Sequence, residues 1–380
     1  MLRDMSLVSV HPTRLDSLTS LRFFAALVVV VHHVTRNFAQ IPVITPLFDI
    51  GGVGVSFFFV LSGFVLAWSN KPVESDRRFY RHRFARVYPL HIATLVFAGV
   101  VLFVQDAPPG FSVIVASFLL LQAWVPAGAF LAGVNGPSWS LSCEAFFYAL
   151  FPRINRAIQS KPTRSIVTLL FVVLVVAVAV TGVVRAFGGP AATFFLYMNP
   201  AYRIWEFLIG IGLALLLKRG VAIRISVPLA ATLAIAAFIG AAGMNYGISN
   251  NLGVLARLPF DSFPPDIASL VLTPLFGLLI VAGAQSDLRG TGRSFLRAPA
   301  LIRLGTWSFA LYLVHLTIVT AATPFVPQSL PFGVAVALAL VTIAGSIGLA
   351  AAAYRFVERP LERLLRKGRT RVAVSTQPTV

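Results

Sequence analysis

The chain has 380 residues, of which 57% are hydrophobic and only 12% are charged. Soluble domains carry about 25% charged residues, and a soluble fold of this length has no way to bury so much apolar surface. The composition therefore predicts an all-α integral membrane protein with many spans. It excludes a disordered chain, a coiled coil and a secreted disulfide scaffold.

The charge is strongly positive, with 31 Lys and Arg against 13 Asp and Glu and a formal net charge of +18. In a soluble protein this excess would suggest nucleic-acid binding. In a membrane protein it follows from the positive-inside rule, with anionic lipid or anionic cytosolic ligands as further partners. The one cysteine, Cys143, excludes an internal disulfide and a multi-cysteine metal cage, and no metal is expected.

Apolar segments follow one another with short gaps from residue 18 onward. The first follows a short polar lead and is interpreted as an uncleaved helix. Two shorter runs, 111–125 and 139–151, are too short to cross a bilayer upright. The predicted spans are 18–37, 50–69, 88–105, 165–187, 203–217, 226–245, 267–285, 304–323 and 332–354.

The basic residues predict the topology. With the N-terminus in the cytoplasm, all but four of the 31 Lys and Arg lie on the inner side. The four outer exceptions are Arg36, Arg185, Arg203 and Arg257. The stretch 111–151 must then cross an odd number of times, so it holds one short re-entrant segment or one broken crossing. Non-helical backbone at membrane depth must be buried in protein or line a cavity. This stretch therefore indicates a functional site.

The organisation is simple. About ten crossings, with both ends in the cytoplasm, form one transmembrane domain over residues 1–367. Residues 368–380 are expected to be a disordered cytosolic tail near the lipid headgroups. No internal repeat is evident, which weakens the interpretation as an inverted-repeat transporter.

The first span places two ionisable residues where lipid disfavours them. Arg22 and His33 are eleven residues apart, which returns them to nearly the same helix face about 16 Å apart along the axis. They are predicted to line one interior channel, with His33 as a general base. His32 points about 100° away. The structural alternative is that the histidines only hydrogen-bond a neighbouring helix.

Two acids lie within apolar segments. Glu144 lies in the broken stretch 111–151. There it can orient an imidazole or stabilise the charged form of that imidazole. The structural alternative is that Glu144 pairs with an arginine. Glu206 follows Arg203 by three residues, so a local ion pair explains it.

Other candidates are less specific. His315 lies in mid-span with Tyr312 one helical turn before it, and both a functional and a structural role are open. Cys143 could be a nucleophile, but a lone buried cysteine usually behaves as a small hydrophobic residue.

The loop KPVESDRRFYRHRFARVYPLH is the densest basic cluster. Its arginines Arg78, Arg81, Arg83 and Arg86 alternate with aromatic residues, which suits phosphate groups and a stacked base. A nucleotide-bearing cofactor and a lipid headgroup both fit. In the second span, Gly51, Gly52, Gly54 and Gly63 permit close helix approach, and a phosphate-binding loop is the weaker alternative.

These segments, in this order, resemble the membrane acyltransferase-3 family. The blocks are RLDSLTSLRFFAALVVVVHH (14–33), GGVGVSFFFVLSGFVLAW (51–68), FYRHRFARVYPLH (79–91), GPSWSLSCEAFFYALFP (136–152), SFALYLVH (308–315) and FVERPLE (356–362). The resemblance covers the chain end to end. The residue sequences of the second and fourth blocks are similar to those of the macrolide O-acyltransferase branch of the family.

The resemblance implies transfer of an acyl group, often acetyl, from acyl-CoA to a hydroxyl, commonly on a sugar. The family's Arg and His of the first span map onto Arg22 and His33, and its basic motif onto Arg81, Arg83 and Arg86, which implies a role in binding CoA phosphates. The WSL…E motif maps onto Trp139, Ser140, Leu141 and Glu144. Many members have an acid where this chain has Ser56.

The expected protein is an acyl-CoA-dependent O-acyltransferase of a bacterial-type cytoplasmic membrane. Its acceptor would be a sugar-containing molecule such as a macrolide glycoside or a surface glycan. His33 would remove the hydroxyl proton or carry the acyl group, Glu144 would assist it, and Arg22 would position the donor or steady the oxyanion. The alternative function is a transporter or flippase of a small glycoside or lipid-linked sugar.

Overall fold

The structure is a computed structural model that describes residues 15–37, 39–70, 75–221, 223–258, 261–290, 294–327 and 329–366. Every regular element in these ranges is helical, and the described ranges contain no β-strand. The predicted all-α membrane class is confirmed. The predicted tail, 368–380, lies outside the described residues.

The chain forms long helices joined by short helical segments. The long helices are α1 (Asp16–Asn37), α3 (Gly54–Ser69), α4 (Asp76–Val104), α7 (Trp139–Gln159), α8 (Thr163–Phe187), α10 (Pro200–Lys218), α11 (Val227–Ser249), α12 (Pro265–Arg289), α13 (Pro299–Ala322) and α14 (Phe332–Ala353). The shorter α-helices are α2 (Ile44–Phe48), α5 (Phe111–Phe118), α6 (Gly128–Ala132), α9 (Gly189–Met198) and α15 (Arg359–Arg366). Single turns are η1 (Gly51–Val53), η2 (Gln122–Trp124), η3 (Gly136–Ser138), η4 (Gly253–Arg257), η5 (Phe295–Arg297), η6 (Thr323–Phe325) and the π-helical η7 (Tyr354–Glu358).

Within the described ranges, 9 helical segments are long and apolar enough to cross a membrane. Each overlaps one of the predicted spans. The largest differences are that the fifth segment begins at Gly189, the third begins at Asp76, and the last continues to Arg366. From Asp76 onward the arginine-rich segment, predicted as a loop, is therefore the first part of α4, whose first turn is capped by the Ser75 hydroxyl accepting from the Arg78 amide.

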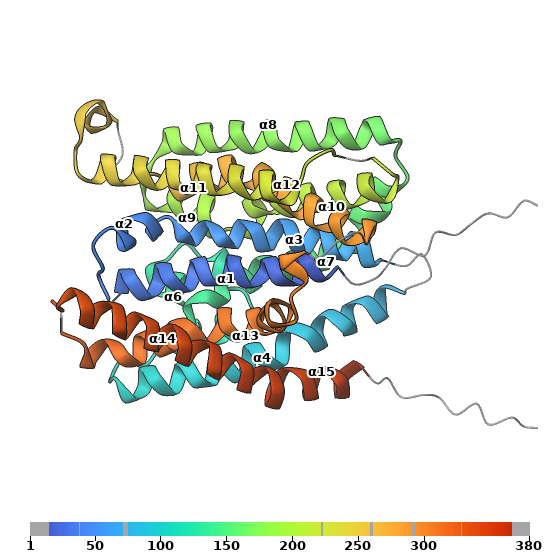
Figure 1. Cartoon of the computed structure of the whole chain (residues 1–380). Coiled ribbons are helices and arrows are strands. Elements are labelled where there is room, and N and C mark those ends of the chain that lie inside the picture. Colours follow the sequence, from blue (N-terminus) through green and yellow to red (C-terminus); the bar gives the residue numbers. More distant parts are fainter. Residues whose placement is uncertain are drawn as a thin grey trace, which may run out of the picture.

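The helices run side by side, and the described chain ends at Leu15 and Arg366 lie at the same end of the bundle (Figure 1). We call this the terminal end. α1 and α4 both begin there. This arrangement agrees with an even number of crossings. Which side of the membrane the terminal end faces stays a prediction.

The stretch 111–151 is broken, as the charge distribution predicts. It contains α5, η2, α6 and η3 before α7 begins, and α7 continues to Gln159, past the predicted end of the short run. Buried polar side chains tie it to its surroundings: the Gln122 amide donates to the Ser138 carbonyl at 2.9 Å, and the Asn135 amide donates to the Leu313 carbonyl of α13 at 3.0 Å. At the breaks Gln122 and Asn135 are buried, whereas Leu121, Trp124 and residues 126–129 are exposed, so the broken stretch is buried in protein only in part.

Two helix pairs approach very closely at glycines. A Cβ at Gly63 of α3 would lie 2.1 Å from the Phe207 carbonyl oxygen, and one at Gly210 of α10 would lie 2.0 Å from that of Val60. A Cβ at Gly305 of α13 would lie 1.8 Å from the Thr19 carbonyl oxygen of α1. Small residues thus let α3 meet α10 and α13 meet α1, as predicted for the glycines of the second span.

The start of α1 is held by another part of the chain. The Asp287 carboxylate accepts from the Ser17 amide at 2.8 Å and from the Ser17 hydroxyl at 2.6 Å. The Ser20 hydroxyl donates to the Leu296 carbonyl at 2.6 Å. An acid at a helix N-terminus satisfies orphan amides and complements the helix dipole. These bonds fix the rotation of α1, and hence the direction of its polar side chains.

Arg203 and Glu206 form the predicted local ion pair at 3.2 Å, and both are fully buried. Arg203 also donates to the Ser56 hydroxyl at 3.0 Å and to the Ser269 hydroxyl at 3.1 Å. Although the topology places Arg203 in the outer half, it lies in the interior and not at a surface. Ser56, at the position where the family resemblance leads us to expect an acid, is a structural partner of this arginine.

Candidate active site

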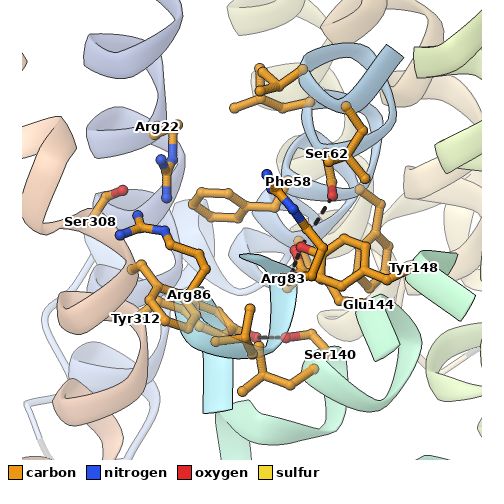
Figure 2. A pocket seen from close by; sticks show the side chains of 18 residues that line it. Arg22, Phe58, Ser62, Arg83, Arg86, Ser140, Glu144, Tyr148, Ser308 and Tyr312 are labelled. Carbon is orange, nitrogen blue, oxygen red and sulfur yellow. Dashed lines mark hydrogen bonds between the residues drawn. The ribbon is translucent and has the colours of Figure 1, made fainter. Parts of the chain in front are cut away.

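One cavity, which we call the arginine cavity, opens between α1, α3, α4, α7 and α13 and has a volume of about 140 Å³. Its polar lining is Arg22, Ser62, Arg83, Arg86, Ser140, Glu144, Tyr148, Ser308 and Tyr312 (Figure 2). Arg22 comes from the terminal part of α1, and Arg83 and Arg86 come from the terminal part of α4. The cavity therefore lies toward the terminal end of the bundle.

The carboxylate in this cavity is bound to a neutral partner. Tyr148, four residues after Glu144 on α7, donates its hydroxyl to Glu144 at 2.8 Å, and Ser62 donates to the Tyr148 oxygen at 3.5 Å. Arg86 is paired with two acids of the C-terminal helices, Glu358 and, at 3.4 Å, Glu362. The positive charge of Arg86 is thus largely compensated by the FVERPLE block.

Arg22 has no direct partner of this kind. Within the described part of the chain it forms no hydrogen bond or ion pair, and the carboxylates of Glu144 and Glu358 act on its charge only at longer range. Its guanidinium group lies beside that of Arg86 at the cavity (Figure 2). Because an uncompensated charge at membrane depth is costly, this pair of cations is suited to an anion or a polarised carbonyl oxygen.

The four predicted phosphate-binding arginines divide into two groups. Arg83 and Arg86 line the arginine cavity, whereas Arg78 and Arg81 are exposed on the first turns of α4. Ligand sites for drug-sized molecules usually measure about 300–1,000 Å³. A cavity of about 140 Å³ therefore has room for the reacting end of a large donor but not for its nucleotide.

A second cavity of about 230 Å³ lies near the other end of the same helix. We call it the histidine cavity. Its polar or aromatic lining is His32, His33, Arg36, Asp49, Trp139, Tyr197 and Tyr312. Arg36 and Asp49 form an ion pair at 3.3 Å, and Asn245 donates to Asp49 at 3.1 Å. Val55 and Tyr312 line both cavities, so the two spaces are neighbours.

His33 contacts a histidine of another helix. The Nδ1 atom of His33 lies 3.1 Å from Nε2 of His315, and 3.0 Å from the Val29 carbonyl oxygen one turn earlier on α1. His315 is fully buried, and its Nδ1 atom lies 3.1 Å from the Leu311 carbonyl oxygen. His32 makes a similar contact at 2.8 Å with the Phe48 carbonyl oxygen.

The predicted single channel is divided in two. Arg22 lines the arginine cavity and His33 lines the histidine cavity, because eleven residues of helix separate them. Glu144 lies with Arg22 and does not line the cavity of His33. The reason is the direction of α7: Trp139, its first residue, faces the histidine cavity, and the helix then runs along the arginine cavity.

Two further predicted residues lie where the cavities meet. The Ser140 and Tyr312 hydroxyls are 3.0 Å apart, and both reach the Pro137 carbonyl oxygen, at 3.1 and 3.0 Å. Tyr312 also packs on Phe58, with ring centroids 5.9 Å apart. This cluster is the wall between the two cavities.

Cys143 reaches neither cavity. It is fully buried, and its thiol donates to the Met198 carbonyl at 3.2 Å. The structure thus places it in the core, as the structural alternative predicts. Among the described residues, no group of three or more His, Cys, Asp or Glu is placed to hold a metal ion.

Sequence reasoning missed several lining residues. Tyr148 could have been found, because the spacing i, i+4 places it on the same helix face as Glu144. Glu358 and Glu362 belong to the segment FVERPLE (356–362), and only the fold shows that they reach Arg86. Tyr197 and Asp49 carry no local signal, because they come from short elements whose positions depend on tertiary packing.

A larger hollow of about 1060 Å³ lies along the other face of α1, against α11 and α12. Its wall is mostly apolar and contains no histidine and no acid. A groove of this kind suits hydrocarbon. It lacks the proton acceptors and hydrogen-bonded carboxylate of the two smaller cavities, so it is not the candidate active site.

The comparisons with known proteins agree with this picture. The family described as Acyltransferase domain matches residues 15–351. The chain is 38% identical to the acyltransferase MdmB of Streptomyces mycarofaciens, over 96% of this chain and 95% of that protein. It is 30% identical to the exopolysaccharide production protein ExoZ of Rhizobium meliloti, over 85% and 92%.

A more distant relative is the peptidoglycan O-acetyltransferase OatA of Listeria monocytogenes, 22% identical over 91% of this chain and 56% of that protein. No solved structure matches the chain significantly. The family match covers most of the chain, and the MdmB alignment is nearly full length for both proteins. This multi-pass membrane protein therefore belongs to the acyltransferase-3 family and is an acyltransferase.

Proposed function

We propose that the protein transfers a short acyl group, acetyl above all, from acyl-CoA to a hydroxyl of a sugar-containing acceptor. The observation that carries the proposal is the pair of neighbouring cavities, one lined by three arginines and the other by His33. Relatives named for exopolysaccharide production and peptidoglycan O-acetylation support a glycan hydroxyl as acceptor. A macrolide glycoside is the alternative acceptor within the same chemistry.

The donor approaches from the terminal end. Arg78 and Arg81, exposed on α4, hold the phosphates of the nucleotide, and the thioester enters the arginine cavity beside Arg83 and Arg86. Arg22 directs its guanidinium group at the carbonyl oxygen and stabilises the negative charge that develops there. The small volume of the cavity favours a short acyl group.

The acceptor occupies the histidine cavity. Nε2 of His33 takes the proton from the acceptor hydroxyl as the oxygen attacks the thioester carbonyl carbon. The new C–O bond forms, the C–S bond breaks, and the departing CoA thiolate receives the proton from His33. Because His33 and Arg22 line different cavities, the carbonyl must lie at the wall formed by Tyr312 and Ser140.

The test uses purified protein in detergent with acetyl-CoA and a panel of hydroxyl compounds, with water as the simplest. Release of CoA thiol and acetylated product are measured for wild type and His33→Ala. We expect His33→Ala to lose at least about 100-fold in rate. A wild-type rate of acetyl transfer in His33→Ala would contradict the mechanism. Wild-type protein that binds acetyl-CoA but acetylates no compound would contradict the assignment of acetyl-CoA as donor. A stable acetyl-histidine found by mass spectrometry would replace proton transfer by covalent catalysis.

Membrane orientation has its own test. We propose that the terminal end faces the cytoplasm, in a bacterial-type cytoplasmic membrane, because the basic segments lie there. Cys143 is buried, so new cysteines at exposed positions report accessibility. In intact cells a membrane-impermeant maleimide should label Asn250→Cys and leave Ser160→Cys unlabelled. The reverse pattern would invert the topology.

The transporter alternative has no support in the comparisons, since the family is one of acyltransferases.

A further inference from the structure

We propose that His315 is the positioning residue of His33: its Nε2 atom accepts the Nδ1 hydrogen of His33 and shares the proton that His33 gains during transfer. The inference rests on the proposed function. It gives a buried imidazole the place that a carboxylate takes in other nucleophile-activating triads.

Hydrogen-bond chemistry determines the tautomers of both rings. The Leu311 carbonyl can only accept, so the Nδ1 atom of His315, 3.1 Å away, must carry the hydrogen. The neutral ring then has its lone pair on Nε2. This atom lies 3.1 Å from Nδ1 of His33 and must accept from it.

The second partner of His33 agrees with this assignment. The Val29 carbonyl also can only accept, and it lies 3.0 Å from the same Nδ1 atom. One hydrogen on Nδ1 of His33 is therefore directed at two acceptors. The lone pair of His33 is left on Nε2, which is the nitrogen available for an acceptor hydroxyl in the histidine cavity.

The buried carboxylates nearest to the two cavities are paired with other side chains. Within the described ranges no acid is hydrogen-bonded to His33: Glu144 accepts from Tyr148, Glu206 is paired with Arg203, and Asp49 is paired with Arg36. His315 is the side chain that contacts Nδ1 of His33, the ring nitrogen that does not face the acceptor hydroxyl. It is fully buried, so the site can preserve this contact without competition from bulk water.

The proton path balances without any other reactant. The acceptor O–H bond breaks and a bond forms between that hydrogen and Nε2 of His33, which becomes cationic. The Nδ1 hydrogen then bonds to Nε2 of His315 as a charge-assisted hydrogen bond, or transfers to it and leaves the cation on His315. Both steps reverse when the CoA thiolate takes the proton, so the pair ends neutral.

The test compares His315→Leu and His315→Gln with wild type in acetyl-CoA-dependent transfer, measuring kcat and the KM of acetyl-CoA. Leucine at position 315 has no atom that can accept a hydrogen bond from His33. Glutamine keeps an oxygen that accepts from His33 but takes up no proton. The control is His91→Gln, since His91 is a fully buried histidine whose Nε2 donates to the Ser117 carbonyl and which lines neither cavity.

We expect His315→Leu to lower kcat by about 10–100-fold, as loss of an outer partner does in comparable sites. The KM of acetyl-CoA should stay unchanged, His315→Gln should recover part of the loss, and His91→Gln should retain wild-type kcat. A kcat within twofold of wild type in His315→Leu overturns the proposal, and so do equal losses in the Leu and Gln variants.

Thermal unfolding in detergent separates folding from positioning. If His315→Leu unfolds, His315→Gln decides alone: a folded variant with kcat lowered and KM unchanged supports the proposal, and wild-type kcat overturns it. His33→Ala in the same assay separates the two hypotheses. Full activity there contradicts the proposed function itself, whereas its loss beside an active His315→Leu contradicts only the role of His315.

Discussion

The arginine cavity and the histidine cavity share Val55 and Tyr312, yet their polar groups are satisfied in different ways. In the arginine cavity, charged groups face the space, and among the described residues Arg22 forms no ion pair; Glu144 and Glu358 act on its charge only at longer range. In the histidine cavity, the ion pair of Arg36 and Asp49 is internally balanced, and the imidazoles are held by carbonyl oxygens.

The difference teaches where each kind of chemistry can occur. A buried cation without a direct counter-ion in a membrane protein is suited to a ligand that brings negative charge to it. Neutral imidazoles with defined tautomers are suited to moving a proton. One cavity is therefore built to stabilise charge on the donor, and the other to activate the acceptor. Arg22 and His33 lie about three helical turns apart along α1, so both side chains must reach toward the wall at Tyr312 for one carbonyl to meet the donor side and the acceptor side.

Loss of Arg22 should give the largest effect in the arginine cavity. We expect Arg22→Gln to lower kcat by about 100–1,000-fold, because an oxyanion donor acts mainly in the transition state. Arg22→Lys keeps the charge but not the planar fork, so it should recover only part of the rate. Steady-state kinetics with acetyl-CoA checks both variants. An effect on KM with kcat unchanged would instead show that Arg22 only binds the donor.

The link between the cavities depends on the close approach of α1 and α13. Gly305→Ala would place a Cβ 1.8 Å from the Thr19 carbonyl oxygen, so the two helices must separate. We expect a loss of about 1–3 kcal/mol in stability, together with lower activity, because the contact of His33 with His315 depends on this packing. The unfolding midpoint in detergent measures the first effect.

Gly345→Ala is the matched control, since a Cβ at Gly345 meets no atom within 4 Å. It should leave the activity unchanged and should not lower the midpoint, because alanine favours a helix more than glycine does. Equal unfolding midpoints for Gly305→Ala and Gly345→Ala would show that α13 can move away from α1 without loss of stability. The close approach of the two helices would then not be needed for function.

Much of the fold could be predicted from the sequence, because lipid makes composition and charge unusually informative. Hydrophobic length predicts each span, and the basic segments require the broken stretch 111–151. The same logic finds Arg22, His33 and Glu144, since ionisable groups at membrane depth need a reason to be there.

Pairings between distant segments could not be predicted. Helical spacing places Arg22 and His33 on one face, but it does not show that Tyr312 from α13 divides the space between them. The partner of His33 is on α13, 282 residues away. The expectation that Glu144 assists His33 depended on the direction of α7, which only tertiary packing determines.

The smallest expected effect concerns the exposed arginines of α4. Arg81→Gln should raise the KM of acetyl-CoA by a few fold and leave kcat unchanged, because an exposed contact to a phosphate contributes about 1 kcal/mol or less. The increase should shrink in high salt, where screening already weakens the wild-type contact. Arg83→Gln, at the cavity, should be less sensitive to salt, because buried charges are screened less. If the two variants respond equally to salt, the division of the arginines into a surface group and a cavity group is wrong, and the whole basic segment acts as one attracting surface for the donor.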